Sequence, residues 1–226
     1  EDDESSLENR VKGNENSTLL EHHHVQARSQ AEIDFFGSSI SHIDDKSNPI
    51  FIKKGEINDE KIVSEIINQN PDLLVCYGAS LIKSNLLNVF QGRFLNVHLG
   101  LSPYYRGSGT NVWPLINDEP EMVGATFMYI DTGIDTGDIV EQAYYDININ
   151  DTAADIIDKQ LDLFPPMLSR SIKNLRQNKL NRVKQDLNKG AYYTRRYPKD
   201  GKINWHDLSA KQVHNLIRAL YGPYPP

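Results

Sequence analysis

The chain of 226 residues is 38% apolar and 24% charged, as in globular proteins that bury a core in one domain or a domain with an appendage. Its net charge of −7 gives no electrostatic attraction for phosphate backbones and does not favour nucleic acid as a ligand. The single cysteine, Cys76, cannot form an internal disulfide, and no apolar run is long enough to span a bilayer, so we expect a soluble cytoplasmic protein.

The N-terminal part of the chain is polar. Residues 1–18 form an acidic run without an apolar period, and the chain begins with Glu, which predicts a loop or disordered segment in a chain that starts within a longer protein. The His-His-His run at 22–24 invites a metal interpretation, but consecutive helical residues point in different directions and no second His cluster lies nearby. We favour a solvated helix surface. Apolar residues between 25 and 36 predict a helix that packs one face.

The stretch from residue 50 to 77 indicates strand, helix and strand. Apolar residues at 50–52 predict a short strand, and Asn58 suits the N-cap of a helix that stops at Pro71. The continuous apolar run 73–77 is typical of a strand buried on both faces of a parallel sheet, with Cys76 as a core residue. This alternation predicts an α/β fold with a twisted, mostly parallel sheet and flanking helices.

A polar pair ends the next predicted strand, residues 93–98. Asn96 and His98 share one face, because side chains at i and i+2 on a strand point the same way. Residues 99–109 are rich in Gly, Pro and Ser, so the pair lies where strand becomes loop. Since α/β sheets usually place their chemistry at such ends, we predict a functional site there.

An acidic loop follows the predicted strand 123–130. Asp131, Asp135 and Asp138 are spaced by Gly and Thr, a pattern compatible with a calcium loop or with a plain solvated turn. The calcium motif would need a Glu at its twelfth position and flanking helices, and this sequence has neither, so we expect no metal.

The C-terminal third is predicted to be mostly helical. A helix begins near residue 151 and is expected to end or kink at the two prolines 165–166. Residues 192–196 suggest a short strand. Ser209 and Gln212 form a capping box for a last helix, which ends at Gly-Pro.

These residues carry a family resemblance. Asn96-Val97-His98, followed by Ser102-Pro103-Tyr104-Tyr105-Arg106-Gly107 and later by Gly133-Ile134-Asp135-Thr136-Gly137-Asp138-Ile139, resembles the 10-formyltetrahydrofolate-dependent formyltransferases. That family has an Asn, a His and an Asp in this order and spacing. The resemblance implies a Rossmann-like catalytic domain over residues 19–188, truncated at its N-terminus, and the start of a C-terminal segment over 189–226. The missing N-terminal strand is expected beside the strand at 72–77.

The resemblance implies attack of an amine on the formyl carbon of 10-formyltetrahydrofolate. We assign Asn96 to stabilising the oxyanion, His98 to proton transfer and electrostatics, and Asp135 to orienting His98 and relaying a proton through water. The resemblance also implies which residues line the folate pocket: Tyr77, Gly78, Leu81, Asp131, Gly133 and Ile134.

The loop after His98 looks more like enzymes that formylate the amino group of a nucleotide-linked sugar for surface glycans such as lipopolysaccharide. The substrate contacts that this implies are Ser102, Tyr104, Tyr105, Arg106 and Gly107, with Arg195 and Arg196 as further phosphate candidates. Arg suits a diphosphate through its planar fork. Tyr as core and Arg as surface charge remain the alternative interpretation.

Other activities stay open at this point. A methionyl-tRNA or glycinamide ribonucleotide formyltransferase would carry the same three residues, and a non-catalytic sugar-nucleotide-binding protein is a third alternative. We expect a small-molecule substrate, no nucleic acid and no membrane, and leave a homodimer open.

Overall fold

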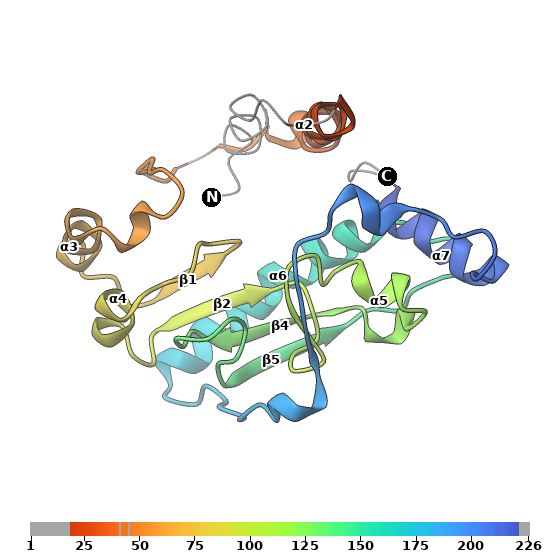
Figure 1. The fold of residues 1–226 in the computed structure, drawn as a ribbon. Helices are drawn as coiled ribbons and strands as arrows, with labels where there is room; N and C mark the ends of the chain where they lie inside the picture. The colour runs from red at the N-terminus through yellow and green to blue at the C-terminus, as the bar shows by residue number, and fades with distance from the viewer. Residues whose placement is uncertain (1–18, 41, 45, 222–226) are drawn as a thin grey trace.

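The computed structural model describes residues 19–40, 42–44 and 46–221, so the prediction for residues 1–18 and the Gly222-Pro223 pair expected after the last helix lie outside the described residues. A central sheet has the strand order β1-β2-β4-β5 (Figure 1). A second, small sheet pairs β3 with β6. The strands are β1 (Leu74–Tyr77), β2 (Phe94–His98), β3 (Tyr105–Gly107), β4 (Gly124–Tyr129), β5 (Ile139–Tyr144) and β6 (Ala191–Tyr193). The helices are α2 (Leu19–Ile40), α3 (Glu60–Asn68), α4 (Ser84–Val89), α5 (Trp113–Ile116), α6 (Ala153–Arg176) and α7 (Ala210–Leu220), with 3-10 turns at Glu56–Asn58, Pro120–Met122, Leu187–Lys189 and Pro198–Gly201.

The α/β class with flanking helices is confirmed, but the strand directions differ from the prediction. In the central sheet β1, β2 and β5 point the same way and β4 runs against its neighbours β2 and β5, so β1 and β2 are the only adjacent parallel pair among the described strands. For β4 and β5 one reason is the length of the connection. A parallel crossover needs a dozen or more residues, usually with a helix, and the loop between β4 and β5 spans only residues 130–138.

Helix α6 covers one face of the sheet (Figure 1). Met167 packs with Leu95, Val97, Phe127 and Val140, which are buried on β2, β4 and β5. The two prolines at 165–166 were expected to end or kink this helix; they do not end it, because α6 runs through them from Ala153 to Arg176. One physical reason is that the carbonyls left without donors belong to the preceding, solvent-exposed turn, while Met167 beyond the prolines is anchored in the core.

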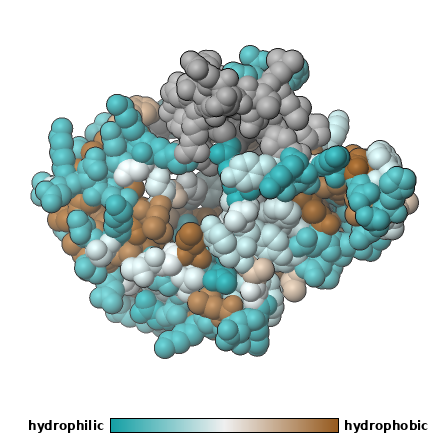
Figure 2. Space-filling view, viewed as in Figure 1, coloured by the Kyte–Doolittle hydropathy of each residue, from teal (hydrophilic) through white to brown (hydrophobic). Residues whose placement is uncertain are grey.

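Helices α3 and α4 pack beside β1 through Val63, Leu86 and Phe90. Strand β1 was expected to be buried on both faces, but Val75 and Tyr77 are exposed because no described strand or helix covers that face. On the face shown in Figure 2, hydrophobic surface gathers over the side of the molecule that holds α3, α4 and β1.

Two further predictions need correction. Residues 50–52 form no strand in the structure, since no described strand pairs with them, and Phe51 is exposed. Cys76 is only partly buried, because it lies on the edge strand β1 rather than in the interior. None of the helices in the described ranges is long and apolar enough to cross a membrane.

Candidate active site

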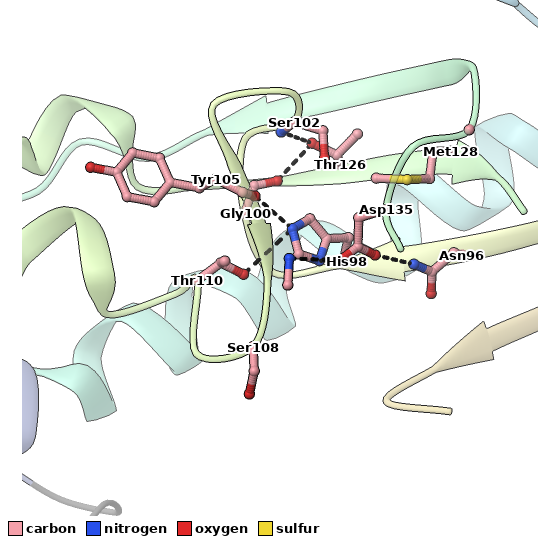
Figure 3. A network of polar contacts seen from close by, with 12 residues as sticks. Asn96, His98, Gly100, Ser102, Tyr105, Ser108, Thr110, Thr126, Met128 and Asp135 are labelled. Carbon is pink, nitrogen blue, oxygen red and sulfur yellow. Dashed lines mark hydrogen bonds and ion pairs between the residues drawn. The ribbon is translucent and has the colours of Figure 1, made fainter. Parts of the chain in front are cut away.

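The Asp135 carboxylate joins the two polar side chains of β2 (Figure 3). Its Oδ1 accepts a hydrogen bond from Asn96 Nδ2 at 2.9 Å, and its Oδ2 lies 3.4 Å from His98 Nδ1. A third donor, the backbone N–H of Gly107, reaches Oδ2 at 2.9 Å. The three residues singled out by the sequence therefore form one hydrogen-bonded cluster, although 39 positions separate Asn96 from Asp135.

Strand alternation places this cluster on the face away from α6. Leu95 and Val97 are buried in the core that α6 covers, so Asn96 and His98 point to the opposite side. His98 is only 6% exposed, which holds its imidazole in one orientation.

Both ring nitrogens of His98 have partners. Nε2 lies 2.8 Å from the carbonyl oxygen of Tyr105 and 3.4 Å from Thr110 Oγ1. A carbonyl only accepts, so we assign a proton to Nε2. Nδ1 then faces the Asp135 carboxylate, so contacts on both sides of the ring fix its orientation.

Two glycines make this packing possible. A Cβ at Gly100 would lie 2.7 Å from His98 Nε2, so any larger residue would displace the imidazole. Gly107 has φ 101°, and a Cβ there would lie 2.2 Å from the carbonyl oxygen of Tyr193. The Gly107 amide therefore approaches Asp135 through a backbone conformation that L-residues adopt only with strain.

A pocket of about 480 Å³ of empty space, part of it open to solvent, adjoins Asn96 and Asp135. Its walls are the segment after β1 and the acidic loop. Four of the six predicted folate residues line it: Leu81, Asp131, Gly133 and Ile134. Tyr77 and Gly78 do not, because the chain turns after β1 and presents residues 79–82 instead.

Sequence reasoning missed several wall residues of this pocket. Cys76 is one of them, and its thiol donates to Asn96 Oδ1 at 3.3 Å. Met128 lies on the same wall from β4. Both residues read as core in a single sequence, and only the pairing of β1, β2 and β4 brings them beside Asn96.

The predicted substrate residues divide into an outer and an inner set. Tyr104 is exposed and Arg106 is half-buried, with an Nε atom that is buried and has no hydrogen-bond partner among the described residues. Ser102 and Tyr105 are buried at 1% and 2% exposure, so their assignment to substrate contact does not fit the structure. For Tyr105 the physical reason is that it begins β3 with its side chain on the buried side, whereas Tyr104 before the strand is exposed and Arg106, the next residue of the strand, is half-buried.

Tyr105 instead supports the loop. Its hydroxyl donates to Glu119 and accepts from Asn117 Nδ2, and its ring stacks on Tyr193 with centroids 4.9 Å apart. Burial, reinforced by the bond to Glu119, raises the pKa of the Tyr105 hydroxyl. Ser102 is held through its backbone by Thr126 and Gln142.

The three loop carboxylates have separate partners. Asp131 accepts from Gly133 N–H and Thr136 Oγ1 within the loop, and Asp138 pairs with Arg182 Nε at 3.0 Å. No group of three or more His, Cys, Asp or Glu within the described ranges is placed to hold a metal ion. The geometry therefore gives the calcium interpretation no support.

The chain belongs to the formyl transferase family. The model of the formyl transferase domain matches residues 16–172, and that of the formyl transferase C-terminal domain matches residues 196–226. The first of these regions contains all three members of the Asn96, His98 and Asp135 cluster.

The names of individual relatives give different substrates for the formyl transfer. The chain is 34% identical over 182 residues to a methionyl-tRNA formyltransferase of Acetivibrio thermocellus, covering 80% of this chain and 57% of the relative. It is 32% identical to WlaRD, a sugar 3N-formyl transferase crystallised in the presence of dTDP and 5-N-formyl-THF, with a TM-score of 0.57 over 65% of this chain and 53% of that one. It is also 32% identical to an N-formyltransferase from Helicobacter canadensis in complex with folinic acid and dTDP-3-aminofucose, with a TM-score of 0.54 over 62% and 51% of the two chains. The chain thus spans little more than half the length of the curated relative and of these solved structures.

Proposed function

We propose that the protein transfers the formyl group of 10-formyltetrahydrofolate to an amine, with Asn96, His98 and Asp135 as catalytic residues. The observation that carries this proposal is the Asp135 carboxylate, bonded to the Asn96 amide and adjacent to the His98 imidazole at the wall of an open pocket. Family membership supports the same reaction type.

The cluster suits the two demands of formyl transfer. Attack of an amine on the formyl carbon creates an oxyanion, and Asn96 Nδ2 has a second N–H beyond the one bound to Asp135 that can donate to it. One such donor is worth about 3–4 kcal/mol in the transition state. The amine must also lose a proton, and the folate nitrogen must gain one as its bond to the formyl carbon breaks. The Asp135 carboxylate with its imidazole partner is placed to accept the amine's proton, which water can relay to the leaving nitrogen.

We assign the pocket beside Asn96 to the folate. Its walls are formed by residues 79–82 and by the loop from Ile130 to Gly137, which offer backbone groups and small side chains. Support comes from the two solved relatives named above, which were crystallised with 5-N-formyl-THF or folinic acid.

We further propose a nucleotide-linked amino sugar as the amine, in a pathway that builds a surface glycan. Both solved relatives carry dTDP or a dTDP-amino sugar. In this chain Tyr104, just before β3, is exposed, and Arg106 on β3 is half-buried, next to Gly107, whose amide contacts Asp135. The free Arg106 Nε, within the described part of the chain, suits a diphosphate oxygen.

A second candidate amine is charged initiator tRNA, because the relative with 34% identity is a methionyl-tRNA formyltransferase. The net charge of −7 gives this chain no general attraction for RNA phosphates, which favours the sugar.

The test is formyl transfer by the full chain from 10-formyltetrahydrofolate to a panel of amines. The panel contains dTDP-linked 3-amino and 4-amino deoxysugars, glycinamide ribonucleotide and methionyl-tRNA. We expect turnover of one amino sugar, reduced by Arg106→Gln mainly through KM. Turnover of methionyl-tRNA alone would overturn the sugar assignment, and no turnover of any amine would overturn the enzymatic proposal.

A further inference from the structure

A short segment between α6 and β6 fastens the acidic loop from outside. We call residues 182–185 the strap. Arg182 Nε pairs with Asp138 Oδ2 at 3.0 Å, and its guanidinium lies 4.2 Å from the centre of the Tyr129 ring. Val183 exchanges two backbone hydrogen bonds with Ile139, at 2.7 and 3.0 Å. The strap is therefore fixed to the end of the loop by both side-chain and backbone contacts.

Gln185 continues these contacts toward the catalytic cluster. Its Nε2 donates to the carbonyl oxygen of Gly137 at 2.6 Å and to that of Asp135 at 3.0 Å. The side chain is half-buried, so water competes little for these bonds. Gln185 thus holds the backbone of the loop at the residue whose carboxylate contacts Asn96 and His98.

The backbone at Asp135 needs such support. Asp135 has φ 53°, in the left-handed region that costs a non-glycine residue about 1 kcal/mol or more. Conformations of this kind persist only where the surroundings hold them. The two bonds from Gln185 hold the backbone at Asp135 itself and at Gly137, two residues further on, and so restrict the direction in which the Asp135 carboxylate leaves the chain.

The same stretch of chain reaches Asp135 from a second side. After the strap, β6 pairs with β3 in parallel register, with Gly107 opposite Tyr193. The Gly107 amide then donates to Asp135 Oδ2. Residues 182–193 thus hold Asp135 by its carbonyl and, through β3, by its carboxylate, although they lie between the two matched family regions, which end at residue 172 and begin at residue 196.

We infer that Gln185 is a positioning residue for formyl transfer, which sets the Asp135 carboxylate against Asn96 and His98 without touching substrate. This inference rests on the proposed function for its effect on turnover, but its structural content is independent of that function. It predicts that removing the Gln185 amide changes the surroundings of His98, since Asp135 Oδ2 is the partner of His98 Nδ1.

The test compares Gln185→Met with Gln185→Glu and with Arg170→Met in the full chain. Gln185→Met keeps the length of the side chain and removes both donors, and Gln185→Glu keeps its volume. Arg170→Met is the matched control, because it removes a side-chain contact to Glu141 on the same β4-β5 hairpin from α6. We expect kcat to fall about 10- to 100-fold in both Gln185 variants, with a smaller change in the dissociation constant of 5-formyltetrahydrofolate, and no change in Arg170→Met.

A second readout does not depend on activity. The imidazole ¹⁵N resonances of His98, identified by their absence in His98→Gln, should shift in both Gln185 variants and stay unchanged in Arg170→Met. Thermal unfolding shows which variants are folded, and one folded Gln185 variant is enough for the test. If the wild-type chain formylates no amine, the proposed function fails while these resonances still decide the positioning role. Unchanged His98 resonances in every folded Gln185 variant would overturn it.

Discussion

Asp135 is the one residue of the cluster that contacts both others, and its place depends on the rest of the chain. Asn96 and His98 are set by the alternation of β2, whereas Asp135 sits on a loop and receives hydrogen bonds from Asn96 and Gly107 and, at its carbonyl, from Gln185. A loop residue with this many fixed partners is suited to hold a proton-transfer group in one geometry.

Replacing Asp135 by Asn should reduce kcat about 100- to 10,000-fold, because an amide cannot accept the proton that the amine loses. Binding of 5-formyltetrahydrofolate, measured by fluorescence titration, should change far less, since the pocket walls remain. Asp162→Asn, an exposed position on α6, is the control for a lost carboxylate. Near-normal turnover in Asp135→Asn would contradict the assignment.

Gly107→Ala should abolish most turnover and lower the melting temperature. The new Cβ would collide with the Tyr193 carbonyl and pull the Gly107 amide from Asp135. Gly109→Ala is the matched control, because Gly109 also has a positive φ, of 68°, but the nearest atom to its Cβ would be 3.4 Å away. We expect Gly109→Ala to cost stability of about 1 kcal/mol and to keep most activity. Equal activity loss in both variants would show that backbone strain alone is responsible.

At the scale of elements, α6 begins with a complete capping box. Thr152 Oγ1 accepts from the Asp155 N–H, and the Asp155 carboxylate accepts from the Thr152 N–H at 2.8 Å and from its hydroxyl. The side-chain bond from Thr152, followed by the backbone bond, lowers the pKa of Asp155 below its ordinary 3.8. The ionised carboxylate is therefore favoured in the folded state.

This shift makes stability depend on pH in a defined direction. Because the folded-state pKa is the lower one, the contribution of Asp155 is complete above pH 3.8 and is lost as the pH falls through the folded pKa. Asp155→Asn should lower the free energy of unfolding at pH 7 by about 1 kcal/mol and flatten its decline in acid. Urea unfolding between pH 2.5 and 7 measures this pH dependence, with Asp158→Asn on the same helix as the control. If the free energy of unfolding of Asp155→Asn declined in acid as steeply as that of the wild type, the capping role would be contradicted.

At the scale of the whole molecule, a substitution in the core on the α6 face of the sheet should change stability without changing activity at the site on the opposite face. Met167 is 1% exposed and packs on the face of the sheet opposite Asn96 and His98. Met167→Ala should cost about 2–5 kcal/mol of unfolding free energy by opening a cavity. Leu161→Ala on the same helix is 51% exposed and should cost much less. At a temperature where Met167→Ala is folded, its kcat should match wild type, and a large loss of kcat there would show that core and site are coupled.

The local sequence pattern was sufficient to predict several features of the fold. The capping box at Ser209 and Gln212 forms as predicted, and Asn96 and His98 share one face of β2. These features depend on neighbours within four residues, so periodicity and spacing reveal them. The reversed direction of β4, the continuation of α6 past its two prolines and the exposure of β1 were not predicted. The first depends in part on the short β4–β5 connection, and the other two depend on what packs against the element.

The sequence by itself determined the family and the identity of the Asn96, His98 and Asp135 cluster, because residue type and spacing are properties of the chain alone. Only the tertiary structure decided that Tyr105 and Ser102 turn inward, that Cys76 lies beside Asn96, and that Gln185 reaches the carbonyl of Asp135. Such contacts join residues 20 to 50 positions apart, and no local pattern records them. They are fixed by strand register and by the course of the chain after α6, both of which arise from packing the whole core at once.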